Sequence, residues 1–148
     1  MSDPTFAELL RRLISPATRS ASARTVEAFG WLIFLEGNVL VLAPYWVAWL
    51  LSLSDFSAAT AVYFRLAGLL VAGLGLLYIV SGRLNSREFV FASMLDRPLV
   101  PFVMLGFWYW AQFPAVLAIL FSLQDFGGFL WTLWAWRNEK APSSPPRR

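Results

Sequence analysis

Apolar residues fall into four long blocks, separated by short polar stretches. Each block is long enough for a helix that rises ~1.5 Å per residue to cross a hydrocarbon core ~30 Å thick. The pattern predicts four membrane-spanning helices at about residues 26–51, 58–82, 87–112 and 114–137. We therefore expect an all-α integral membrane protein, folded as a four-helix bundle, with its membrane domain at residues 25–138.

The start of the third block allows two interpretations. In one, the span begins near Arg87 and ends near Gln112. In the other, residues 83–97 form an interfacial helix and the span begins at Pro98, because proline is favoured in the first turn of a helix. Pro98 and Pro101 predict a kink in either case, since each lacks the N–H that a helix interior requires.

The two ends of the chain are polar and basic. Residues 1–24 contain the stretch PTFAELLRRLI, whose spacing predicts a short amphipathic helix that ends near Ser15-Pro16. Such a helix lies on a membrane surface with its cationic residues towards anionic headgroups, and a frayed tail is the alternative. Residues 139–148 are rich in Pro and Ser, so we expect a disordered basic tail.

Small and polar residues form a stripe on two of the predicted helices. Steps of three and four along the last block connect Ala118, Ser122, Asp125, Gly128, Thr132 and Ala135. The same steps in the second block connect Ala61, Arg65, Gly68, Ala72, Gly75 and Gly82. Stripes of this kind let neighbouring helices approach closely, so we expect both to be packing faces and Arg65 to face the bundle.

Composition supports the membrane class and excludes several chemistries. Of the 148 residues, 58% are hydrophobic and 14% charged. The chain has no His and no Cys, so its side chains form no disulfide and supply no His or Cys ligand to a haem or an iron–sulfur cluster. No metal-ligand spacing is present either. The net charge of +3 comes from residues that flank the apolar blocks, which argues against nucleic-acid binding.

The positions of the basic residues predict the topology. Ten of the twelve Lys and Arg residues lie in the two terminal segments or in the loop between the second and third blocks. The two loops on the opposite side contain none. Because basic loops stay in the cytoplasm, we expect a multi-pass protein with both termini cytoplasmic, N-in and C-in.

Polar residues inside the predicted spans are the candidate site. They are Glu36, Asn38, Arg65, Tyr78, Asp96, Arg97, Gln124 and Asp125. Charged groups in a bilayer normally pair and face inward, so we expect Arg65 and Arg97 to contact Glu36 and Asp125, in a pairing that the sequence leaves open. Such a constellation is either a structural ion-pair network or a cavity in which a carboxylate binds or protonates a lipophilic ligand.

Several short motifs resemble one known family. They are Ala43-Pro44, Arg65 with Gly68, Leu77-Tyr78, Arg97-Pro98, and Asp125 followed by Gly127-Gly128 and Trp131. Over residues 28–137 the chain resembles the small bacterial four-helix membrane proteins of the DoxX-like and BphX-like group. The resemblance implies a four-helix bundle in the bacterial inner (cytoplasmic) membrane. Some members are associated with quinone-linked oxidoreductases, which suggests an accessory-subunit role.

Two functions follow from these observations. The first is an accessory or assembly component of the membrane, linked to a membrane protein partner such as an oxidoreductase or to further copies of itself, with a buried Glu/Asp–Arg network for its own fold. The second is a membrane-embedded enzyme or carrier for a hydrophobic small molecule, with Glu36 and Asp125 lining the site. A proton carrier is weaker, because no relay connects the two acids to either surface. The sequence names no cofactor.

Overall fold

The structure, a computed structural model, describes residues 4–16, 18–110 and 113–139. Its elements are α1 (Phe6–Ile14), α2 (Ala21–Leu42), α3 (Pro44–Leu50), α4 (Ala58–Arg83), α5 (Arg87–Asp96), the 3₁₀ turn η1 (Arg97–Leu99), α6 (Val100–Trp110) and α7 (Ala115–Asn138). Within those ranges the chain is all-helical, as expected. The predicted disordered tail falls almost wholly on residues 140–148, outside the described residues.

Helices α2 and α4 form an antiparallel pair that is packed on small residues. A Cβ atom added to Gly37 would lie 2.3 Å from the backbone nitrogen of Ala72, and one added to Gly68 would lie 2.7 Å from the carbonyl oxygen of Gly37. Further along, a Cβ at Gly75 would lie 2.5 Å from the nitrogen of Phe34. Only glycine permits this approach, so the stripe predicted on the second block is a packing face.

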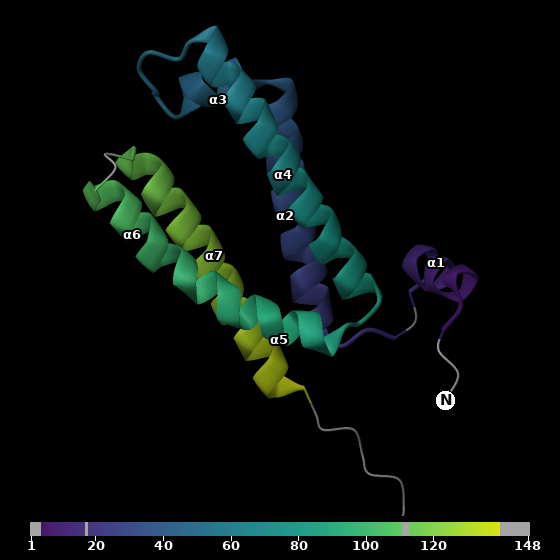
Figure 1. The fold of residues 1–148 in the computed structure, drawn as a ribbon. Coiled ribbons are helices and arrows are strands. Elements are labelled where there is room, and N and C mark those ends of the chain that lie inside the picture. Colours follow the sequence, from purple (N-terminus) through teal and green to yellow (C-terminus); the bar gives the residue numbers. More distant parts are fainter. Residues whose placement is uncertain (1–3, 17, 111–112, 140–148) are drawn as a thin grey trace, which may run out of the picture.

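Helices α6 and α7 form the second pair, and the two pairs diverge. Figure 1 shows them close together at the end where α5 leads across from α4, and apart at the end that carries α3. Side-chain contacts between α2 and α7 extend from Thr25–Thr132 as far as Glu36–Gln124. The four helices are thus two pairs joined over part of their length, where the sequence predicted a four-helix bundle.

The first predicted span, residues 26–51, is corrected to two helices. Helix α2 begins earlier, at Ala21, because the Ser20 side chain caps it by accepting a hydrogen bond from the Ala23 N–H at 3.1 Å. It ends at Leu42, and Ala43 leaves the helical region with φ −133° and ψ 53°. Pro44 has no N–H to continue α2 and instead opens α3.

The third span follows the first of the two interpretations. Helix α5 begins at Arg87, where the Ser86 side chain accepts from the Phe89 N–H at 3.3 Å. The turn η1 lies at the prolines, where the sequence predicted a kink. Helix α6 follows it and ends at Trp110. Together these elements form one apolar stretch, Arg87–Trp110.

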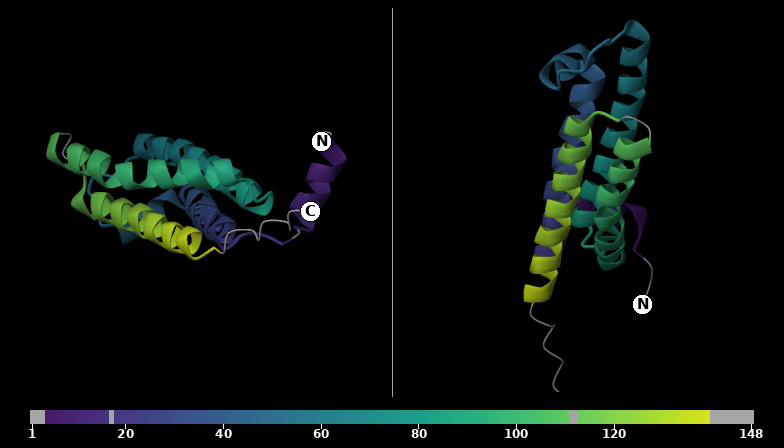
Figure 2. Two further views of the ribbon diagram at one scale, coloured as in Figure 1. Left: turned by 90° about the horizontal axis from the view of Figure 1, so that it is seen from below. Right: turned by 90° about the vertical axis from the view of Figure 1, so that its left-hand side faces the viewer.

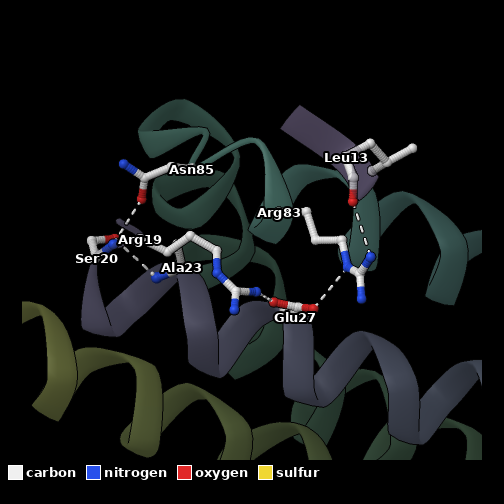
Figure 3. A network of polar contacts seen from close by, with 7 residues as sticks. All are labelled: Leu13, Arg19, Ser20, Ala23, Glu27, Arg83 and Asn85. Atoms are coloured by element: carbon white, nitrogen blue, oxygen red, sulfur yellow. Dashed lines mark hydrogen bonds and ion pairs between the residues drawn. The ribbon is translucent and has the colours of Figure 1, made fainter. Parts of the chain in front are cut away.

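A polar network holds the segment before α2 against the end of α4. Glu27 accepts hydrogen bonds from both Arg19 and Arg83, as Figure 3 shows. Arg83 also donates to the Leu13 carbonyl at 2.9 Å, which ties down the end of α1. The two views in Figure 2 show α1 to one side of the helix pairs and away from the α3 end.

Four helices are long and apolar enough to cross a membrane: Ala21–Leu42, Ala58–Arg83, Arg87–Trp110 and Ala115–Asn138. Large apolar side chains such as Leu70, Phe102 and Leu123 are more than two-thirds exposed on their outer faces. A surface of this kind suits contact with lipid tails and has too much apolar area for water. The chain therefore has the architecture of a multi-pass membrane protein.

Candidate functional site

A groove of about 470 Å³ lies between the two helix pairs. Its walls come from α2, α3 and α4 on one side and from α7 with Phe113 on the other. Its lining includes residues of α3, at the end where the two pairs lie apart (Figure 1), and the Glu36–Gln124 contact is part of it. Its volume is in the range of ~300–1,000 Å³ that small-molecule sites occupy.

The lining of the groove is apolar except at one place. Leucine, valine and aromatic side chains cover most of it, and the aromatic ones are Trp46, Phe64, Phe113 and Phe121. The polar exception is the pair Glu36 and Gln124, in which the Gln124 Nε2 donates to the Glu36 Oε2 at 2.8 Å. A largely apolar cavity with a few converging polar groups is the usual form of a ligand site.

The helical repeat of α2 explains why Glu36 faces this groove. Leu32, Glu36, Val39 and Leu40 are spaced by three and four residues, so they share one face of the helix and all line the groove. Gly37 belongs to the neighbouring face, which is buried against α4. Glu36 itself is half-buried.

A second polar cluster lies deeper, around Arg97. This side chain is completely buried, with its guanidinium carbon 3.8 Å from the centre of the Phe29 ring and 5.0 Å from that of Tyr78. Its Nη1 donates to the Thr132 Oγ1 at 3.2 Å. The Nε and Nη2 atoms have no hydrogen-bond partner among the described residues. Aromatic faces attract a guanidinium, and they take the place of the expected carboxylate.

Gly128 makes room for the Arg97 side chain. A Cβ at this position would lie 2.9 Å from the Phe29 ring and 3.1 Å from the Arg97 Nη1. One turn further along α7, Thr132 is also completely buried, and its hydroxyl donates to the Gly128 carbonyl at 2.9 Å. Thr25 of α2 approaches the same hydroxyl at 3.0 Å. The stripe of small residues predicted on the last block is therefore the face that receives Arg97.

The expected ion pairs between Arg65 or Arg97 and Glu36 or Asp125 are absent from the described residues; the ion pairs found there are Arg12–Glu8, Arg19–Glu27 and Arg83–Glu27. Arg65 does not face the interior as expected but is exposed. Its Nε donates to the Val41 carbonyl at 3.3 Å. Val41 lies in the last turn of α2, where carbonyls lack partners within the helix, and this explains the contact.

One of the other predicted site residues lies in the Arg97 cluster, and the rest lie in neither cluster. Tyr78 belongs to the Arg97 cluster, and its ring packs edge-on against Phe89 at 4.9 Å. Asn38 donates to the Phe34 carbonyl of its own helix at 2.7 Å, and Asp96 is exposed. Asp125 is half-buried, about one turn before Gly128 in α7. The structure thus brings together Glu36 with Gln124, and Tyr78 with Arg97.

Sequence reasoning missed two features of the site. The groove depends on the divergence of the helix pairs, for which a pattern of apolar residues gives no signal. The partners of Glu27 were also missed, although Arg19 and Arg83 are among the basic residues that flank the apolar blocks. For Arg97, a helical repeat indicates the face on which the residue lies but not the aromatic rings opposite it.

Within the described residues, no group of three or more Asp or Glu side chains could hold a metal ion. Comparison with known protein families, curated proteins and solved structures finds no match to this chain. The resemblance to DoxX-like proteins therefore stays a prediction from short sequence motifs. The site itself carries the functional argument, and its chemistry is that of an apolar groove with a single carboxylate.

Proposed function

We propose that this protein binds a lipophilic small molecule in the groove between its two helix pairs, as a membrane-embedded carrier or enzyme. The observation that carries the proposal is the groove of about 470 Å³ with Glu36 and Gln124 as its polar pair. A molecule dissolved in the bilayer would replace lipid contacts with the apolar walls and place one polar group beside this pair.

The state of the carboxylate favours this function over a purely structural role. A structural network would hold Glu36 in an ion pair with an arginine, because an unpaired charge in a bilayer is costly. Glu36 instead accepts a hydrogen bond from a neutral amide and lines the groove. An accessory role beside a membrane oxidoreductase stays a prediction from the resemblance, and it is compatible with a bound lipophilic molecule.

The proposal includes an orientation with both termini in the cytoplasm. Helix α1, the turn from α4 to α5 and the end of α7 lie away from the α3 end (Figures 1 and 2). Arg11, Arg83, Arg87 and Arg137 belong to these segments, and positively charged segments favour the cytoplasmic side. In this orientation the groove faces the outer half of the bilayer.

Binding of a neutral lipophilic fluorophore tests the proposal. N-phenyl-1-naphthylamine brightens in apolar sites, and the protein in lipid nanodiscs should bind it saturably above the signal of empty nanodiscs. The variant Ala67→Trp places a large side chain in the groove, since Ala67 is one of its lining residues. We expect this variant to lose most of the saturable signal.

The matched control is Ala92→Trp, the same substitution at an exposed position of α5 that does not line the groove. It should bind the fluorophore like the wild type. Equal binding by the wild type, Ala67→Trp and empty nanodiscs would refute a ligand site in the groove.

A further inference from the structure

The charge of the groove distinguishes between classes of lipophilic ligand. Of the described residues that line it, Glu36 is the only one with an ionisable side chain, and none of them is Lys or Arg. Arg97 does not line the groove, and its guanidinium is enclosed by Phe29, Tyr78 and Thr132. Among the described residues, a ligand in the groove therefore meets one carboxyl group and no basic side chain.

We infer that the groove takes a lipophilic cation, an amine or onium compound with large apolar substituents and no anionic group. The inference rests on the proposed function and names its ligand class. Binding would pair the positive centre with Glu36 and bury the apolar substituents against the leucine and phenylalanine walls. A carboxylate beside a desolvated cation interacts far more strongly than the same pair in water, because the local dielectric constant is low.

The aromatic lining supports a cationic ligand independently of the carboxylate. Trp46, Phe64, Phe113 and Phe121 come from α3, α4, the turn before α7 and α7, so rings surround the groove from both pairs. Faces of aromatic rings attract cations, and tryptophan does so best. Phe56 packs edge-on against Phe64 at 4.8 Å and against Tyr45 at 5.5 Å, which limits the movement of the wall at the α3 end.

Other lipophilic ligands fit the groove less well. A fatty acid or an anionic lipid would bring a second negative charge next to Glu36 with no arginine to compensate. A zwitterionic phospholipid would leave its phosphate without a positively charged partner in the groove. A wholly neutral hydrocarbon would give Glu36 and Gln124 no polar contact beyond the hydrogen bond between them, and polar groups that lose water without gaining a new partner are costly to bury.

Two ions of the same size and shape but opposite charge provide the test. Tetraphenylphosphonium and tetraphenylborate should compete with N-phenyl-1-naphthylamine for the protein in zwitterionic nanodiscs, after subtraction of the signal from empty nanodiscs. We expect the phosphonium to displace the fluorophore at a concentration at least about tenfold lower than the borate, the scale of one close charge pair in a medium of low dielectric constant.

The variant Glu36→Gln should abolish this preference for the cation, and Glu88→Gln should keep it. Glu88 makes the matched control because it is an exposed glutamate in the first turn of α5, outside the groove. Size-exclusion chromatography of both variants checks that they fold like the wild type.

The outcomes separate the inference from the proposed function. Equal displacement by the two ions, or a preference that survives Glu36→Gln, would overturn the cationic ligand and leave the groove as a site for neutral molecules. A fluorophore signal that Ala67→Trp does not reduce would overturn the proposed function and the cationic ligand together.

Discussion

At the scale of single residues, Arg97 shows how an apolar interior accommodates a guanidinium that forms no ion pair with the described residues. The rings of Phe29 and Tyr78 cover its carbon at 3.8 and 5.0 Å, and Thr132 accepts its one side-chain hydrogen bond. Removing a hydrogen-bond partner from a buried polar group costs more than the hydrogen bond itself contributes, because the group is left without a partner. Loss of the Thr132 hydroxyl should therefore lower the free energy of unfolding more than loss of a threonine hydroxyl whose contacts are exposed.

The variant Thr132→Val tests this environment. It keeps the shape of the side chain but leaves all of the Arg97 nitrogens without a side-chain acceptor, so we expect a loss of about 1–3 kcal/mol in the free energy of unfolding. Unfolding by SDS titration, followed by circular dichroism, measures it. Thr60→Val is the control, since the Thr60 hydroxyl pairs only with Ser57 at the exposed start of α4.

A double variant shows whether the loss acts through Arg97. The double variant Thr132→Val with Arg97→Met lacks the guanidinium that Thr132→Val alone leaves unpaired. Arg97→Met should therefore lower the free energy of unfolding less in the Thr132→Val background than in the wild type. Additive losses would mean that the two side chains do not depend on each other.

At the scale of elements, the pair α2–α4 depends on a few glycines that let two backbones touch. We expect Gly37→Ala to destabilise the protein by about 1–3 kcal/mol, because overpacked contacts must be relieved by moving the helices apart. The added Cβ would otherwise lie 2.3 Å from the Ala72 nitrogen and 2.6 Å from the Gly68 carbonyl oxygen. The same SDS titration measures the change.

Gly73 of α4 provides the matched control. A Cβ at this position meets nothing within 4 Å, and alanine is the better helix former, so Gly73→Ala should leave stability unchanged or raise it slightly. If both variants unfolded at the same SDS concentration as the wild type, close packing of α2 on α4 would not be what holds this pair together.

How far the sequence predicts these elements depends on the kind of signal. The lengths of the apolar blocks predict four long helices, and steps of three and four predict the buried faces of α4 and α7. The break at Pro44 was missed because the aromatic residues after it continue the apolar block. The charge pairing was predicted wrongly for Arg97 and Arg65, since a helical repeat gives the face of a residue but not what lies opposite.

At the scale of the whole molecule, two helix pairs joined at one end form a groove at the other. The joint contains the Arg97 cluster, the contacts between α2 and α7 and, at the end of α4, the Arg19–Glu27–Arg83 network (Figure 3). Helix α1 is attached there, with Phe6, Leu10 and Ile14 exposed along one side as the amphipathic pattern predicted. This arrangement fits a helix on one membrane surface and a groove that opens in the opposite half of the bilayer.

Native mass spectrometry of the protein, extracted gently from its own membrane, shows directly whether the groove holds a lipophilic molecule. We expect a reproducible adduct with the mass of a lipophilic small molecule on the wild type and on Ala92→Trp, and its loss from Ala67→Trp. Bare protein in all three preparations, an adduct that Ala67→Trp retains, or a stoichiometric protein partner in place of the small molecule would contradict it.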